Sequence, residues 1–267
     1  MTSFPTPAWL VGCGNMAGAM VEGWRAGGSD FSGVTVIRPS GTPVEGLRTV
    51  TEYPDEQPRF VMLGFKPQKL DEVAPRLAPH VGDDCILVSM LAGVAAASLR
   101  ELFPSARAIV RIMPNLPVAQ LFGVTGIYSA DMKDETELAR LPFASLGIIV
   151  FCETEQELGV VGAVAAAGVA YVARFAEALA RSAEALGIRP IMARMMADQT
   201  LIGTGAYAAT TSASMSEIAR RVASPKGTTE QGLAVLDAPD GLQQLVDRAL
   251  AAAIRRGEEL AAAARRN

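Results

Sequence analysis

The stretch Gly12-Cys13-Gly14-Asn15-Met16-Ala17-Gly18 decides how the first half of this chain folds. It follows the apolar run Trp9–Val11 and opens a segment of helix formers. The spacing fits G-x-G-x-x-(G/A), in which the first glycine permits a tight turn, the second lets the backbone approach a pyrophosphate, and Ala17 allows close packing of helix on strand. Because the motif occupies a strand-to-helix junction, it predicts a dinucleotide site with the pyrophosphate at the helix amino terminus.

Apolar runs alternate with helical stretches through the first 152 residues. The runs are apolar on both faces, which is typical of parallel strands covered by helices on both sides. We therefore expect a doubly wound α/β domain of the Rossmann type over residues 1–152. The expected strands are Trp9–Val11, Val34–Ile37, Phe60–Leu63, Cys85–Met90, Ala108–Ile112, Val124–Tyr128 and Ile148–Phe151, and the expected helices are Asn15–Ala26, Pro67–Leu77, Val94–Leu102 and Lys133–Phe143.

Residues 153–267 are expected to form a second, all-α domain, because strand signals stop after Cys152. Small residues on its long helices let backbones approach closely, and apolar faces on an elongated helical domain need another subunit to cover them. We therefore expect a homodimer or a larger homo-oligomer. The predicted helices are Gly159–Leu186, Pro190–Val222, Thr229–Leu236 and Gly241–Ala264, with a loop at Ser224–Gly227.

Composition argues against several other classes of protein. A net charge of -4 and 6% aromatic residues over 267 residues do not suit nucleic acid. A single histidine, His80, and three dispersed cysteines offer no ligand cluster, so no metal is expected. The run Gly159–Ala173 is shorter than the roughly 20 apolar residues of a membrane span, and we expect a buried helix there. The first residues do not resemble a secretory signal, so the cytoplasm is the expected location.

The end of the second predicted strand bears on the choice of dinucleotide. An NAD enzyme usually places an acidic residue there for the ribose hydroxyl, whereas this chain has Arg38-Pro39-Ser40. The guanidinium of Arg38 and the hydroxyl of Ser40 can bind a 2′-phosphate, so we expect NADP(H) as the cofactor. An ordinary solvated surface arginine is the alternative.

A second motif, Ser224-Pro225-Lys226-Gly227-Thr228-Thr229, closely resembles the signature loop of the pyrroline-5-carboxylate reductases. Other segments resemble that family in the same order, and together they span about residues 8–250: Gly12–Ala17, Phe65-Lys66-Pro67-Gln68, Ser89 with Ala92-Gly93, and Arg111-Ile112-Met113-Pro114-Asn115-Leu116-Pro117. The resemblance implies reduction of Δ1-pyrroline-5-carboxylate to L-proline with NAD(P)H. It also implies a Rossmann domain followed by a helical domain that dimerises and often builds larger rings.

The resemblance implies roles for individual residues as well. Thr229 would be the catalytic residue, because it would hydrogen-bond the imine nitrogen and turn the imine carbon, C5 in proline numbering, toward the nicotinamide. The substrate would be held by Thr229 with Ser224, Gly227, Thr228 and Asn115. The cofactor would be held by Gly12, Gly14, Asn15, Met16, Ala17, Arg38, Ser40, Gly64, Phe65, Lys66, Pro67, Leu91, Ala92, Gly93, Met113 and Pro114.

Two departures from the family pattern keep other functions open. Ala166-Ala167-Gly168-Val169-Ala170-Tyr171 replaces the family's usual Gly-Ser-Gly-Pro-Ala-Tyr, and Lys226 stands where a glycine is common. The alternatives are a related NADPH-dependent reductase of another cyclic imine or carbonyl substrate, and a catalytically silent NADP-binding paralogue. The Ser224–Thr229 loop can also be an ordinary helix start capped by a hydroxyl side chain. His80 is expected in a surface turn that ends a helix, and not in catalysis.

Overall fold

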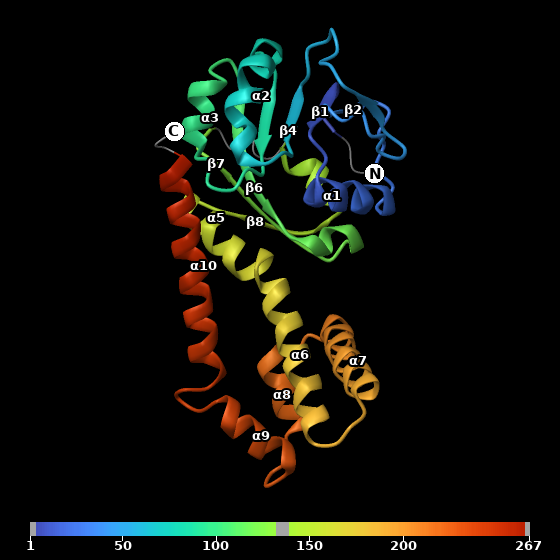
Figure 1. Ribbon diagram of the computed structural model, residues 1–267, viewed down its shortest axis with the longest axis vertical. Coiled ribbons are helices and arrows are strands. Elements are labelled where there is room, and N and C mark those ends of the chain that lie inside the picture. Colours follow the sequence, from blue (N-terminus) through green and yellow to red (C-terminus); the bar gives the residue numbers. More distant parts are fainter. Residues whose placement is uncertain (1–3, 132–138, 265–267) are drawn as a thin grey trace. The chain divides into compact units, whose positions relative to one another are not determined.

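The computed structural model describes residues 4–131 and 139–264 of the chain (Figure 1). It divides into two compact units, which we describe separately. Unit 1 contains the chain up to Ala167 together with the residues from Ala253 onward, and unit 2 contains Gly168–Ala252. The domain boundary predicted at residues 152–153 falls at the end of the last strand, and the first compact unit continues beyond it.

Unit 1 is built on an eight-stranded sheet with the order β3-β2-β1-β4-β5-β6-β7-β8. The chain starts in the middle of the sheet at β1 and continues outward first on one side and then on the other, which is the doubly wound arrangement that was predicted. Ligands of such sheets bind at the carboxyl ends of the strands, beside the point where the winding reverses. The strands are β1 (Ala8–Val11), β2 (Val34–Ile37), β3 (Arg48–Val50), β4 (Phe60–Leu63), β5 (Ile86–Ser89), β6 (Ala108–Pro114), β7 (Gly123–Ser129) and β8 (Gly147–Phe151).

Two features of the sheet differ from the prediction. β7 runs antiparallel to β6 in an otherwise parallel sheet. The short helix η3 (Leu116–Gln120) joins these two strands, and a connection of that length cannot carry the chain back for a parallel pairing, which needs a dozen residues or more. β3 was not predicted, because its three residues are polar or only partly buried and form no apolar run.

Both faces of the sheet are covered, as predicted. Successive strand residues point to opposite faces, so Leu10 of β1 joins one apolar core and Trp9 joins the other. The first core contains Trp24 of α1, and the second contains Leu77 of α2 and Leu99 of α3. The helices of this part are α1 (Asn15–Ala26), η1 (Pro67–Lys69), α2 (Leu70–Leu77), η2 (Ala78–His80), α3 (Ala96–Leu102) and η4 (Leu141–Phe143). Most of the predicted helix Lys133–Phe143 lies outside the described residues.

The predicted helix Gly159–Leu186 corresponds to three consecutive elements. These are α5 (Glu155–Val161), a π-helical turn η5 (Gly162–Ala166) and α6 (Gly168–Ala185), and the first two belong to unit 1. π-helical turns are rare and are often found at functional sites. The stretch Glu155–Ala185 is long and apolar enough to cross a membrane by length and composition alone. Within the stretch Gly159–Ala173, only Gly162 and Ala163 are fully buried, so the expectation of a buried helix was wrong for the single chain.

Unit 2 is helical, as predicted, with α6 packed on α7 (Pro190–Ala209). The predicted helix Pro190–Val222 is two helices, because the chain turns after Ala209 and starts again at α8 (Met215–Val222). Ser214 caps α8: its hydroxyl accepts from the Glu217 amide, and the Glu217 carboxylate accepts from the Ser214 amide. The remaining helices are α9 (Thr228–Leu236) and α10 (Leu242–Ala264), whose last part belongs to unit 1.

Candidate functional site

The turn after β1, which begins at Gly12, packs closely against Gly64 at the end of β4. Gly12 has a φ of +86°, a left-handed conformation that residues with a Cβ rarely adopt. A Cβ at this position would lie 2.9 Å from the Gly64 carbonyl oxygen and 3.1 Å from Cβ of Phe65. The Gly12 amide donates to Ile37 O of β2, and the Gly64 amide donates to Val11 O of β1. The turn therefore closes only because glycine stands at its start.

The amino terminus of α1 is free to bind an anion. Its N-cap residue is Gly14, which has no side chain with which to cap the first turn, and Gly14 and Asn15 are exposed. Ala17 is buried where α1 passes β4, and its Cβ lies 3.2 Å from the position that a Cβ on Gly64 would take. Uncapped amides at a helix amino terminus, with glycine where the backbone must come close, are what a pyrophosphate needs. These residues therefore fit a dinucleotide.

Arg38 lies beside this turn. It follows β2 directly, and its backbone amide donates to Val50 O of β3. Burial raises the pKa of the Cys13 thiol, and the positive charge of Arg38 partly opposes that effect, so the guanidinium lies within electrostatic reach of the Gly12–Gly18 loop. Ser40 is exposed in the next turn, where its hydroxyl accepts from the Thr42 amide. The structure thus brings both predicted 2′-phosphate ligands to the same edge as the glycine motif.

The other predicted cofactor residues follow neighbouring strands. Phe65, Lys66 and Pro67 come after β4, Leu91, Ala92 and Gly93 come after β5, and Met113 and Pro114 end β6. Leu91 is fully buried in the core beside α2 and α3, its amide donates to Ser89 Oγ and its carbonyl oxygen accepts from the Val94 amide, so its contact with the cofactor stays a prediction. Gly93 has a φ of +78°, and a Cβ there would lie 3.2 Å from the backbone of Leu260 in α10.

Asn115 directly follows β6 and is almost completely buried. Its side-chain nitrogen donates to Ala165 O in η5 at 3.1 Å, and its side-chain oxygen accepts from the Val124 amide at 2.8 Å. Both ends of the amide group are therefore occupied within unit 1, and the side chain ties η5 to the end of β6. Its contact with substrate stays a prediction.

A polar pair at this edge was not predicted. Arg111 lies in the middle of β6, and its Nη1 contacts the Glu155 carboxylate of α5 at 2.7 Å. An arginine inside an otherwise apolar, buried strand is the sequence signal that such a partner exists, because buried charges are paired. The identity of the partner, 44 residues away, could not be read from the sequence.

The signature loop of unit 2 presents its hydroxyl groups to solvent. Ser224, Thr228 and Thr229 are exposed, and Thr228 is the first residue of α9. The N-cap of α9 is Gly227, and no side chain caps the helix among the described residues, so the loop is not an ordinary helix start capped by a hydroxyl. Lys226 has a φ of +60°, a left-handed conformation that favours glycine. Two backbone amides of the loop are already occupied, because the Lys226 amide donates to the Glu230 carboxylate and the Gly227 amide donates to Ser224 O. The amides in the first turn of α9, the hydroxyl side chains and the positive charge of Lys226 are the groups that suit a substrate carboxylate.

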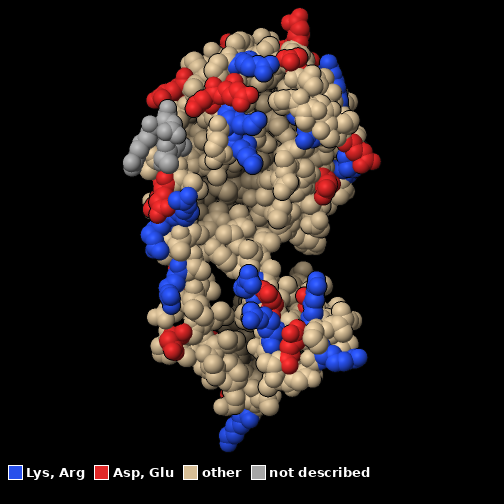
Figure 2. Space-filling model, viewed as in Figure 1, with Lys and Arg blue, Asp and Glu red and all other residues tan. Residues whose placement is uncertain are grey.

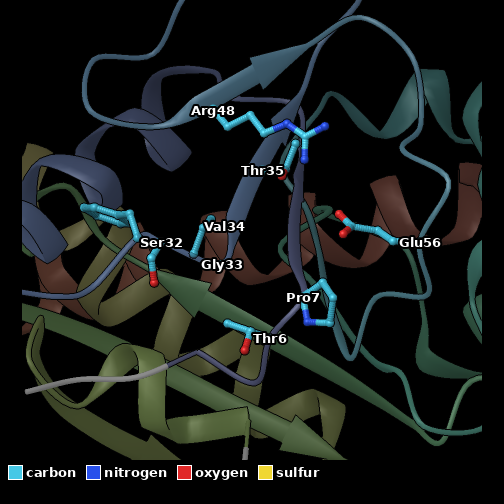
Figure 3. Close-up of a pocket in the computed structure, with 9 residues that line it drawn as sticks. Thr6, Pro7, Ser32, Gly33, Val34, Thr35, Arg48 and Glu56 are labelled. Atoms are coloured by element: carbon cyan, nitrogen blue, oxygen red, sulfur yellow. The ribbon is translucent and has the colours of Figure 1, made fainter.

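A cavity of about 500 Å³ lies at the amino ends of the strands, opposite the glycine motif (Figure 3). Thr6 and Pro7 border it just before β1, Gly33 borders it just before β2, and Arg48 and Glu56 stand at its rim. Because the cavity is at the amino ends of the strands, it is not the place where a doubly wound sheet binds its dinucleotide. On the face of the molecule in Figure 2, basic and acidic side chains are interspersed, without one large basic patch.

Comparison with known proteins points to one family. A family model described as pyrroline-5-carboxylate reductase dimerisation matches residues 155–260. Pyrroline-5-carboxylate reductase of Pseudomonas aeruginosa is 31% identical over 262 residues, which are 94% of this chain and 96% of the relative. A solved pyrroline-5-carboxylate reductase from Coxiella burnetii has a TM-score of 0.85 at 28% identity, with 96% of this chain and 98% of that chain covered. The Plasmodium falciparum enzyme with NADP bound, at 21% identity, has the same fold, with a TM-score of 0.80 and with 96% of this chain and 98% of that chain covered.

Proposed function

This chain belongs to the pyrroline-5-carboxylate reductase family, and we propose that it reduces Δ1-pyrroline-5-carboxylate to L-proline with NADPH, the last step of proline biosynthesis. The observation that carries this function is 31% identity to a named reductase over nearly the full length of both chains. The edge of unit 1 formed by Gly12, Gly64 and the uncapped start of α1 supports NADP(H) as the cofactor. When bound, the reduced nicotinamide supplies a hydride to the imine carbon of the substrate, which becomes C5 of proline.

The cofactor is held mainly by backbone groups. The free amides in the first turn of α1 bind the pyrophosphate, and the helix dipole adds to that attraction. Arg38 pairs with the 2′-phosphate, and the Ser40 hydroxyl donates a further hydrogen bond to it. An acidic residue in place of Arg38 would repel this phosphate, so Arg38 sets the preference for NADPH over NADH.

The substrate needs an anion site for its carboxylate and a donor for its ring nitrogen. Ser224, Thr228 and the amides at the start of α9 bind the carboxylate, and Lys226 adds positive charge beside them. The Thr229 hydroxyl donates to the ring nitrogen, which gains electron density during the reduction. These roles rest on the match of the loop to the family motif and on the exposure of its hydroxyl groups.

A second copy of the chain covers the apolar faces of unit 2. α6 and α7 expose large apolar side chains that include Val172, Phe175, Ile191, Met195, Met196 and Ile202. Exposed apolar surface on this scale marks an interaction site, and the matching family model describes a dimerisation region. The protein is therefore a homo-oligomer, with the homodimer as its basic unit. We propose the cytoplasm as its location.

One observation favours a different imine as substrate. Ala166 and Ala167, which replace a glycine and a serine of the family pattern, line a cavity of about 620 Å³ in unit 1. The loss of the serine hydroxyl removes a polar group from this cavity, and the methyl group that Ala166 adds changes the shape of the cavity. A related reductase of another cyclic imine is therefore the second candidate.

Loss of NADPH absorbance with a panel of cyclic imines tests the proposal. The panel contains pyrroline-5-carboxylate, its six-membered homologue and an uncharged five-membered imine without the carboxylate. We expect the highest kcat/KM for pyrroline-5-carboxylate, because the loop of unit 2 binds its carboxylate. Preference for the six-membered ring would favour the second candidate. NADPH binding without turnover of any imine would mean a catalytically silent paralogue.

A further inference from the structure

Three alternate residues on one face of β6 contact the same stretch of helix. Arg111 binds Glu155 at the start of α5, Met113 packs against Gly162 in η5, and Asn115, just after the strand, binds Ala165 O. A Cβ on Gly162 would lie 3.2 Å from Cγ of Met113, so the methionine side chain can pack against the backbone of η5 because residue 162 is glycine. The second half of β6 and the residue that follows it therefore contact α5 and η5 at three successive points.

Glu155 joins a third element to this contact. Its Oε1 accepts from Arg111 Nη1 at 2.7 Å and also from the Ala96 amide at 2.8 Å, at the first residue of α3. The N-cap residue of α3 is Ala95, which has no side chain able to cap the helix. The Glu155 carboxylate thus caps α3 from a distant part of the chain. One oxygen holds together the start of α3, the middle of β6 and the start of α5.

Among the described residues, Glu155 is the one carboxylate that pairs with the guanidinium of Arg111. The Arg111 side chain is only 12% exposed, and its buried Nε has no hydrogen-bond partner in the part of the chain that the structure describes. Replacement of a buried ion pair by apolar residues is often neutral or stabilising, so stability alone does not explain why a strand would contain one. Removal of one partner, by contrast, leaves the other charge buried and unpaired.

The Arg111–Glu155 pair lies between two segments that are predicted to bind the cofactor. Ala96 follows the segment Leu91–Gly93, and Arg111 precedes the segment Met113–Pro114. Arg111 is also paired in the sheet with Ser89, the last residue of β5, so it lies level with the carboxyl end of that strand. Gly93, Met113, Arg111 and Glu155 line the same cavity of about 620 Å³. A shift of the pair would therefore change the spacing of both segments.

We propose that Arg111 and Glu155 are positioning residues, which hold the Leu91–Gly93 and Met113–Pro114 segments at the spacing that productive binding of the nicotinamide end of NADPH requires. Neither side chain reacts, and both act through the backbone of these segments. The proposal rests on the proposed function for its effect on turnover, but its effect on cofactor binding can be measured without any imine.

The chain offers a matched control in a second ion pair. Arg100 and Asp131 are 2.9 Å apart, and their side chains are 35% and 30% exposed. Asp131 Oδ2 also accepts from a backbone amide, that of Ile109, at 2.6 Å. This pair therefore also joins an arginine and a backbone amide to one carboxylate, although Arg100 donates to Ala106 O as well. It attaches the last turn of α3 to the start of β6, away from the predicted cofactor residues.

The test compares Glu155→Gln and Arg111→Lys with Asp131→Asn and Arg100→Lys in the full-length protein. The readouts are melting temperature, the NADPH dissociation constant from nucleotide fluorescence, and kcat and KM for the imine. We expect melting temperatures to fall similarly in both pairs. The Glu155 and Arg111 variants should raise the NADPH dissociation constant about tenfold and lower kcat roughly 10- to 100-fold, because small misplacements of reacting groups are costly. The KM for the imine should change little.

The control variants should leave NADPH binding and kcat within about twofold of wild type. The proposal is overturned if, at an equal loss of melting temperature, Glu155→Gln and Arg111→Lys have the same NADPH dissociation constants and the same kcat as the control variants. If Glu155→Gln does not fold, the milder Arg111→Lys decides by the same criterion. If wild type binds NADPH but reduces no imine, the proposed function fails, and the dissociation constants still decide whether this pair positions the cofactor.

Discussion

Gly12 and Gly64 lie so close together, at the carboxyl ends of β1 and β4, that neither position has room for a side chain. A Cβ on Gly12 would lie 2.9 Å from the Gly64 carbonyl oxygen, and a Cβ on Gly64 would lie 2.9 Å from the Gly12 carbonyl oxygen. Both contacts are with backbone, so no side-chain rearrangement can relieve them. Since both strands are fixed in the centre of the sheet, this reciprocal contact sets the position of the loop that receives the pyrophosphate.

Gly12→Ala should therefore abolish measurable NADPH binding and lower the free energy of unfolding by about 1–3 kcal/mol, because the new Cβ meets backbone at a left-handed residue. Gly18→Ala is the control: nothing lies within 4 Å of a Cβ there, and the Gly18 amide is already bonded to Gly14 O. Titration of both variants with NADPH, followed by fluorescence, checks this. Normal binding by Gly12→Ala would show that the loop does not hold the cofactor.

Arg38→Ala should erase the preference for NADPH over NADH. A charge-assisted hydrogen bond contributes roughly 1.5–3 kcal/mol, which corresponds to a loss of about 10- to 150-fold in NADPH affinity. NADH affinity should hardly change, since that cofactor has no 2′-phosphate. Both dissociation constants are measured for wild type and variant, and an unchanged ratio between them would remove Arg38 from the site.

Thr229→Ala should lower kcat, because its hydroxyl donates to a nitrogen that gains electron density as the reaction proceeds. Loss of a neutral hydrogen bond that leaves a buried partner unpaired costs around 1–3 kcal/mol, or roughly 5- to 150-fold in rate. Thr229→Ser keeps the hydroxyl and should retain much of the activity. Steady-state kinetics on the best imine give the comparison. A kcat for Thr229→Ala within about twofold of wild type, with an intact fold by circular dichroism, would contradict the assignment.

Ser224 and Thr228 provide the contrast to Thr229. Carboxylate binding is common to the ground state and the transition state, so Ser224→Ala and Thr228→Val should act mostly on KM. Steady-state kinetics with varied imine concentration separate the two constants. A fall in kcat for these variants with an unchanged KM would place both side chains beside the reacting atoms and would contradict their role as carboxylate ligands.

Sedimentation at micromolar concentration should show a homodimer or a larger assembly and no folded monomer. Met195 and Met196 are 57% and 53% exposed on α7, and a charge among such side chains is costly when a second copy covers them. Met195→Glu should therefore weaken the assembly and expose apolar surface to a hydrophobic dye. A stable, active monomer of the wild-type chain would show that unit 2 does not need a partner.

Local signals in the sequence were enough to predict most elements of the fold and the cofactor loop. The Gly12–Gly18 motif is one such signal, since its spacing can be recognised within seven residues although Gly12 and Ala17 pack against the distant Gly64. The capping box of Ser214 and Glu217 is another local signal, and it marks the break between α7 and α8 inside the predicted helix Pro190–Val222. Features that depend on distant contacts had no local signal, and these include the partner of Arg111 and the internal bonds of Asn115.

Reduction of the C=N bond of pyrroline-5-carboxylate, at the imine carbon that becomes C5 of proline, is the central activity that we assign to this chain. The most direct measurement uses NADPH that carries deuterium at both C4 positions of the reduced nicotinamide, with mass spectrometry and NMR of the amino acid product. We predict L-proline with one deuterium per molecule, located at C5, and one NADPH consumed for each proline formed. Proline without deuterium, or no proline while a bulkier imine is reduced, would contradict this assignment.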